Sequence, residues 1–202
     1  MELNKISTTV ETVFGLYAAR GADEYVGEPV SLLEHMGQAA QLAEAGGHDE
    51  EVILAAFLHD IGHLLPQQTG EAMNGYGHLS HEKIGASYLR QNGFSEKIAQ
   101  LVLMHVQAKR YLCFRFPEYH QKLSEASLQT LVFQGGVMTE AEAKAYEEAP
   151  YFSLSLKMRE WDEAAKETEL PLPDVPRYRA MAERHLQEQD CVCGDFKATQ
   201  QR

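Results

Sequence analysis

The segment from about Glu50 to Leu64 is apolar on nearly every side of a helix, which predicts a helix at the centre of the fold. His59 and Asp60 stand side by side within this apolar segment. Burying an imidazole and a carboxylate costs free energy unless something binds them. A metal ion is the usual compensation, because both groups then become ligands. The pair therefore predicts a metal site in the interior of the protein.

The composition is that of a globular protein, with 202 residues and 44% apolar side chains. We expect a single domain over residues 1–202, with a core at about 22–187 and a mobile C-terminal tail at about 188–202. No apolar run is long enough to cross a membrane and no signal-peptide pattern is present, so we expect a cytoplasmic protein without a membrane partner. The net charge of −12 argues against nucleic-acid binding but allows a small anionic ligand. The three cysteines are an odd number, which does not favour a disulfide framework.

Helical periodicity dominates the sequence, and no alternating strand pattern stands out, so we expect an all-α fold. Pro29 suits the first turn of a helix, Ser80 and Ser95 suit capping positions, and Thr139 with Glu142 forms a capping-box pattern. The expected helices cover about 9–19, 29–45, 50–64, 80–91, 95–109, 124–134, a short stretch from 139 to before 150, 152–168 and 176–187.

Six residues on five of these helices are candidate metal ligands. Four imidazoles and two carboxylates exceed the four ligands of one structural zinc, and a carboxylate can bridge, so two metals fit better. Mixed nitrogen and oxygen ligands suit iron, manganese or zinc. We assign the remaining histidines, at 48, 78, 120 and 185, to surface or loop positions. The candidates are His35, His59, Asp60, His81, His105 and Asp162.

Polar residues lie one helical turn from several of these candidates and predict an anion-binding cradle. His63 follows His59 by four residues, Lys109 follows His105 by four, and Arg159 precedes Asp162 by three. Alternatively, these residues are ordinary solvated charges and helix-surface groups. The cradle residues are His63, Lys109, Ser127, Thr130, Gln134 and Arg159.

The spacing of His35, His59-Asp60 and Asp162 resembles the pattern of the HD-domain superfamily, and His81 and His105 are similar to the added ligands of its dinuclear subgroup. Over about residues 22–178 the chain most resembles the HD-domain oxygenases of bacterial phosphonate catabolism, typified by PhnZ and TmpB. The segments that carry this resemblance are Tyr25-Val26-Gly27-Glu28, Leu33-Glu34-His35, Leu58-His59-Asp60-Ile61-Gly62-His63, His81-Glu82-Lys83-Ile84-Gly85-Ala86, the run 105–112, the run 129–136 and Met158-Arg159-Glu160-Trp161-Asp162.

The resemblance implies an HD-domain helical bundle with a mixed-valent Fe(II)/Fe(III) pair and O2 as co-substrate. It implies that His35, His59 and Asp162 hold one iron, that His81 and His105 hold the other, and that Asp60 bridges them. It also implies that the six cradle residues hold a phosphonate group.

The resemblance further implies a catalytic set of Tyr25, Glu28, Asp60 and His63. In the family the tyrosine can occupy an iron position before substrate arrives, and the glutamate responds to the amino end of the substrate. The expected ligand is thus a zwitterionic hydroxyphosphonate, and a homo-oligomer is left open.

Our main hypothesis is oxidative cleavage of the C–P bond of 2-amino-1-hydroxyethylphosphonate, releasing glycine and inorganic phosphate. The first alternative is the same reaction on the N-trimethylated substrate, which would give glycine betaine. The second is an HD-type metal-dependent phosphohydrolase, in which a metal-bound hydroxide attacks a phosphate ester. The third is a non-catalytic HD module, which we disfavour because all six ligand types are present.

Overall fold

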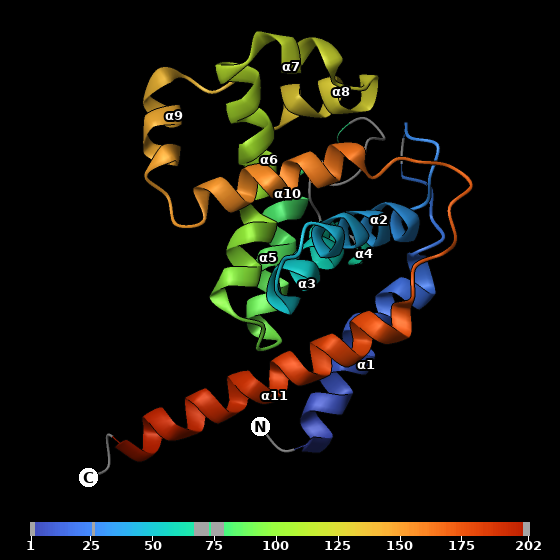
Figure 1. The fold of residues 1–202 in the computed structure, drawn as a ribbon, viewed down its shortest axis with the longest axis vertical. Coiled ribbons are helices and arrows are strands. Elements are labelled where there is room, and N and C mark those ends of the chain that lie inside the picture. The colour runs from blue at the N-terminus through green and yellow to red at the C-terminus, as the bar shows by residue number, and fades with distance from the viewer. Residues whose placement is uncertain (1–2, 26, 67–72, 74–78, 200–202) are drawn as a thin grey trace.

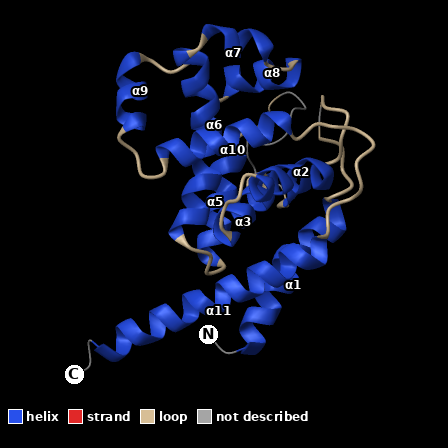
Figure 2. Cartoon of the chain, viewed as in Figure 1, coloured by secondary structure: helices blue, strands red, loops and turns tan. Residues whose placement is uncertain are grey.

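The computed structural model describes residues 3–25, 27–66, 73 and 79–199, and within these residues the chain forms eleven helices and no β-strand (Figure 1, Figure 2). The all-α prediction is confirmed. None of the described helices has the length and apolarity needed to cross a membrane. The helices are α1 (Leu3–Arg20), α2 (Leu32–Ala45), α3 (Glu50–Leu58), α4 (Ile61–Leu64), α5 (His81–Gln91), α6 (Glu96–Arg115), α7 (Pro117–Lys122), α8 (Glu125–Phe133), α9 (Glu140–Glu147), α10 (Phe152–Ala164) and α11 (Val175–Thr199).

Side-chain caps fix the start of several helices, and those at Ser95 and Thr139 were predicted correctly. The Ser95 and Ser124 hydroxyls each accept a hydrogen bond from the backbone N–H three residues ahead, and Thr139 with Glu142 forms a reciprocal capping box. Ser80 precedes α5 as expected. Its backbone is left-handed (φ 66°), however, and its side chain makes no capping bond, so that predicted cap is wrong.

The start of α2 differs from the prediction. Pro29 lies outside the helix, and Ser31 caps it instead, through a capping box with Glu34. The Ser31 hydroxyl and the Glu34 carboxylate satisfy backbone N–H groups at this end of the helix, which begins at Leu32, three residues later than predicted.

Other helix ends also differ from the prediction. The first helix begins at Leu3 and α6 continues to Arg115, whereas α10 ends at Ala164, before the predicted end at 168. The last helix runs to Thr199, so its predicted end at Gln187 is wrong, and the mobility of the tail stays a prediction. The short helix α7 was not predicted, and the segment between the predicted helices over 50–64 and 80–91 lies largely outside the described residues.

The predicted continuous helix over 50–64 is broken at the His59-Asp60 pair. Asp60 leaves helical geometry (φ −104°, ψ 16°) and separates α3 from α4. The turn brings α4 against α5, where Gly62 meets the backbone of His81 so closely that an added Cβ would lie 2.1 Å from the His81 carbonyl oxygen. The break therefore sets the distance between the His-Asp pair and the next candidate ligand.

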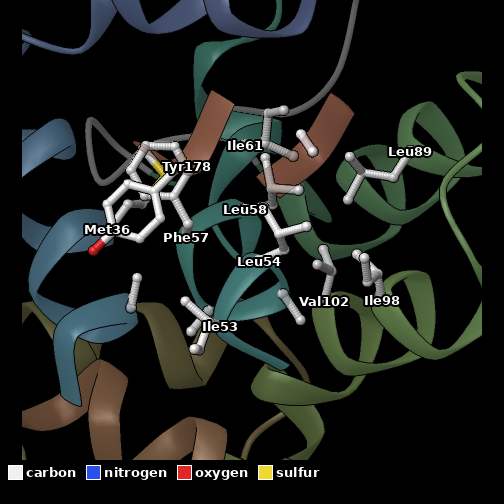
Figure 3. Packing of buried hydrophobic residues seen from close by; sticks show 14 of the residues in the cluster. Met36, Ile53, Leu54, Phe57, Leu58, Ile61, Leu89, Ile98, Val102 and Tyr178 are labelled. Carbon is white, nitrogen blue, oxygen red and sulfur yellow. The ribbon is translucent and has the colours of Figure 1, made fainter. Parts of the chain in front are cut away.

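The central position of α3 is confirmed. Its residues from Val52 to Leu58 are all buried. Figure 3 shows Leu54, Phe57 and Leu58 in the middle of the cluster, with Tyr178 of α11 against Phe57, the ring centroids being 4.4 Å apart. Helices α2, α6 and α11 pack around α3.

The remaining helices lie at two ends of the molecule. Helices α1 and α11 contact one another at the lower end of Figure 1, whereas α7, α8 and α9 lie at the upper end. Helix α6 runs from the core into the upper group, and α10 packs along α6 and α2. The candidate site lies where α2, α3, α5, α6 and α10 face one another.

Candidate metal centre

Three buried side chains from three separate parts of the fold form the first group, metal group 1 (His35, His59 and Asp162). His35 comes from α2, His59 from the end of α3 and Asp162 from α10. The Nε2 atom of His35 lies 3.1 Å from Nε2 of His59 and 3.4 Å from Oδ1 of Asp162. One ion can reach all three.

The second group, metal group 2, consists of Asp60, His81 and His105. His81 is the first residue of α5 and His105 lies in α6, whose packing against α5 brings their Nε2 atoms to 3.0 Å. Oδ1 of Asp60 lies 3.3 Å from the first imidazole and 3.4 Å from the second. All three residues are buried.

Asp60 lies between the two groups. Its Oδ1 faces group 2, while its Oδ2 lies 3.6 Å from Nε2 of both His35 and His59 in group 1. Each oxygen of one carboxylate therefore faces a different group, which is the arrangement of a bridging ligand.

Hydrogen bonding at the far side of the rings shows that group 1 suits a cation. The Nδ1 atoms of His35 and His59 lie 2.9 Å and 2.8 Å from the carbonyl oxygens of Ala165 and Ala56, so each Nδ1 carries the proton and donates it. The two Nε2 lone pairs then face each other at 3.1 Å. Lone pairs at that distance repel unless a positive ion lies between them, as in metal sites where a carbonyl orients the imidazole.

The charge states of the ligands also favour a bound cation. Burial alone would raise the pKa of Asp60 and Asp162. The imidazoles of His59, His105 and His81 hold the pKa of Asp60 well below its usual range, and the Arg159 guanidinium with two imidazoles does the same for Asp162, so both stay ionised. Burial lowers the pKa of His59 to about 4, which keeps it neutral. Oδ1 of each aspartate is buried and has no hydrogen-bond partner among the described residues. Burial acts to lower the pKa of His35, but the hydrogen bond and charge of Asp162 raise it, so the carboxylates favour a positive charge beside this ring. A neutral imidazole at His59 and ionised, unsatisfied carboxylate oxygens suit a divalent or trivalent cation.

Four of the cradle residues meet between α6, α8 and α10, namely Lys109, Ser127, Thr130 and Arg159. The ammonium group of Lys109 donates to the Thr130 hydroxyl at 2.9 Å and lies 3.4 Å from the Ser127 carbonyl oxygen. The guanidinium of Arg159 lies 3.4 Å from the Ser127 hydroxyl. Burial, with the nearby guanidinium, lowers the pKa of Lys109 to about 7. Oε1 of Gln134, at the end of α8, is buried and has no hydrogen-bond partner in the part of the chain that the structure describes.

Two predicted residues stack on imidazoles of the metal groups. The ring of Tyr25 lies parallel to that of His35, with centroids 4.1 Å apart, and the ring of His63 stacks at the same distance on His81. The structure thus places one aromatic ring of the predicted catalytic set beside each group.

The structure also places around Arg159 residues that the sequence prediction missed. Its guanidinium donates to Tyr119 at 2.7 Å and forms ion pairs with Asp162 and Glu163. Glu163 in turn accepts from Lys166 at 3.0 Å. The spacing of the three charged residues of this segment was a usable helical signal. Tyr119 lies in the unpredicted helix α7, and no spacing pattern in the sequence linked it to Arg159.

Of the four histidines predicted to lie on the surface or in loops, none among the described residues belongs to either metal group, and one prediction is corrected. His48 packs edge-on against Trp161, and His78 lies outside the described residues. His185 is buried, not on the surface as predicted, because its Nε2 accepts a hydrogen bond from the Ser95 N–H at the start of α6.

Comparison with known proteins agrees with the resemblance seen in the motifs. The family model described as HD domain matches residues 32–133, which contain four of the ligand candidates from metal groups 1 and 2 together with Asp60. This chain belongs to the HD-domain family. The HD-domain protein is also similar over most of its length to several curated proteins, and the predicted recognition is confirmed.

Two of the relatives carry names that state an activity. The [1-hydroxy-2-(trimethylamino)ethyl]phosphonate dioxygenase (glycine-betaine-forming) of Leisingera caerulea is 40% identical over 88% of this HD-domain chain and 92% of its own. The hydroxymethylphosphonate dioxygenase of Gimesia maris is 37% identical over 88% of each chain. The uncharacterized protein L432 of Acanthamoeba polyphaga mimivirus is 41% identical over 92% of this chain and 85% of its own.

Proposed function

We propose that this HD-domain protein is a di-iron oxygenase that cleaves the C–P bond of 2-amino-1-hydroxyethylphosphonate and releases glycine and inorganic phosphate. The relatives named as phosphonate dioxygenases support oxidative C–P cleavage in general. The observation that carries the proposal is Asp60, whose two oxygens face two separate groups of ligands. The equation balances with O2 as the oxidant, because substrate plus O2 contains the atoms of glycine plus phosphoric acid.

The residues of metal groups 1 and 2 would hold the two irons, with Asp60 between them. When bound, the irons supply the redox chemistry and the site for O2. The protein has to bind the substrate, orient its C1 carbon and exclude bulk water, and the burial of all six ligands suits this task.

The cradle accounts for the phosphonate end of the substrate. Lys109 and Arg159 provide two buried positive charges, and the hydroxyls of Ser127 and Thr130 lie within reach of them. Charge-assisted hydrogen bonds to a phosphonate dianion are the strong class of such contacts. Gln134 and His63 would complete the cradle. In this proposal the amide of Gln134 and its unpartnered buried oxygen face the bound substrate.

Tyr25 and Glu28 would serve the opposite, amino end. They lie in one tight turn, in which the Glu28 N–H donates to the Tyr25 carbonyl at 2.9 Å, and the carboxylate of Glu28 is mostly buried. A buried carboxylate at that end suits a substrate ammonium group. The relative that is named for a trimethylated substrate supports the N-trimethylated compound as the second candidate.

The test is phosphate release from the iron-loaded protein, with and without O2. We expect release from 2-amino-1-hydroxyethylphosphonate in air and none under nitrogen. Release under nitrogen from ordinary phosphate monoesters would instead favour a metal-dependent phosphohydrolase. A strong preference for the trimethylated substrate would reverse our choice between the two hydroxyphosphonates.

A further inference from the structure

Glu28, the proposed partner of the substrate ammonium, already has a cationic partner in this structure. The ammonium group of Lys166 lies 2.9 Å from Oε1 of Glu28, and the Ser124 hydroxyl donates to the same oxygen at 2.5 Å. Both side chains of the ion pair are largely buried, with 15% of Lys166 and 8% of Glu28 exposed. At that burial the interaction is only weakly screened by solvent.

This ion pair ends a row of alternating charges that begins at metal group 1. Asp162 pairs with Arg159, Arg159 with Glu163, Glu163 with Lys166, and Lys166 with Glu28. Every charge in the row has an opposite charge beside it. A substrate ammonium that approaches Glu28 therefore meets a carboxylate whose charge is already balanced.

We propose that Lys166 is a specificity-determining residue, because its ammonium group competes with that of the substrate for Glu28. Lys166 thereby lowers the preference of the site for aminated over non-aminated hydroxyphosphonates. This inference rests on the proposed function. An aminated substrate must displace or share the Lys166 contact, whereas a substrate without an amino group leaves the Glu28 pair intact.

The readout is the ratio of kcat/KM for a substrate with an amino group to kcat/KM for one without, because replacing Lys166 has two effects. Loss of a positive charge weakens attraction for any phosphonate dianion, and this loss is shared by all substrates. Release of Glu28 strengthens attraction only for a substrate that carries an ammonium group. Dividing kcat/KM for 2-amino-1-hydroxyethylphosphonate by kcat/KM for hydroxymethylphosphonate removes the shared effect.

The decisive variant is Lys166→Met, which keeps the length of the side chain and removes its charge. We expect the ratio to rise about tenfold. The matched control is Lys157→Met in α10, where the lysine forms an exposed ion pair with Glu160, and we expect its ratio to equal that of the wild type. In the double variant Lys166→Met/Glu28→Gln the gain should vanish, since the two residues act on each other.

Binding without turnover provides a second readout. Under nitrogen, calorimetry with 2-aminoethylphosphonate and with ethylphosphonate compares ligands that differ in the amino group and lack the C1 hydroxyl. Lys166→Met should raise the affinity for the first relative to the second, also about tenfold.

An unchanged or lowered ratio in Lys166→Met, with an intact fold by circular dichroism, would overturn the inference. A lower melting temperature with an unchanged ratio would make Lys166 a purely structural residue, which is also a refutation. Failure of the proposed function looks different, because the wild-type protein would then release no phosphate from either substrate in an O2-dependent way.

Discussion

Asp60 combines two properties that rarely occur together in one side chain. It is buried, and its two oxygens face different sets of imidazoles at 3.3–3.6 Å. The neighbouring imidazoles keep the Asp60 carboxylate ionised despite its burial, and a cation on each side would balance its charge. The pairs of imidazole Nε2 atoms at 3.0–3.1 Å lead to the same conclusion from the nitrogen ligands.

His81 tests whether the second group takes part in the reaction. We expect His81→Ala to abolish both phosphate release and O2 uptake, because group 2 would keep only two of its three ligands. Both rates are measured on the iron-loaded variant, and His120→Ala in α7, outside both groups, is the control. Turnover of His81→Ala at the wild-type rate would refute the dinuclear assignment.

Lys109 predicts how substrate binding depends on pH. Its pKa is lowered to about 7, so the free protein loses this cation as the pH rises through 7, and kcat/KM should fall there. Arginine stays charged, so Lys109→Arg should move the fall to higher pH. Ionisation of the substrate affects both proteins equally and cancels in the comparison. Identical pH profiles would rule out Lys109 as the group responsible.

At the level of helices, the sequence predicted the elements better than their ends. The cap at Ser95 and the capping box at Thr139 act within one turn, so local sequence was enough to predict them. The break at Asp60 was missed because an apolar pattern is compatible with one helix or two. What decides between them is contact with α5, which is distant in the sequence.

In the candidate site too, features set by local sequence were predicted and features set by tertiary contacts were missed. All six ligand candidates were chosen by residue type and position on the predicted helices, and Lys109 and Thr130, which were assigned to one cradle, are in contact. Tyr119 and Lys166 were missed, because their roles depend on how α7, the end of α10 and the turn at Glu28 meet in three dimensions. Tertiary contacts of single residues leave no periodic signal.

Gly62 tests the packing of α4 against α5. A methyl group at this position would overlap the His81 backbone, so we expect Gly62→Ala to lower the free energy of unfolding by about 2 kcal/mol and to weaken metal binding by group 2. The matched control is Gly15→Ala in α1, where an added Cβ meets nothing within 4 Å and stability should stay equal or rise by up to about 1 kcal/mol. Urea denaturation measures both. Equal stabilities for the two variants would contradict the close packing at Gly62.

In the whole molecule, the metal groups tie distant parts of the fold together. Group 1 joins α2, α3 and α10, and group 2 joins α5 and α6 to the turn that contains Asp60. Helices that are separated by more than a hundred residues, such as α2 and α10, meet at this centre. Bound metal should therefore stabilise the fold as a whole.

Removing the metals tests this coupling. Without cations, buried carboxylates and facing lone pairs destabilise the native state, so chelation should lower Tm by several degrees. Differential scanning calorimetry before and after chelation measures the change, and adding back Fe(II) should restore Tm. An unchanged Tm on complete metal removal would show that the groups do not contribute to stability as ion sites.

The most direct test of the central claim is a crystal structure of the iron-loaded protein with diffraction data on both sides of the iron absorption edge. We predict two anomalous peaks, one within the His35, His59 and Asp162 group and one within the His81 and His105 group, with one oxygen of Asp60 bound to each. A single peak, or two peaks with Asp60 bound to only one of them, would contradict the bridged two-iron centre.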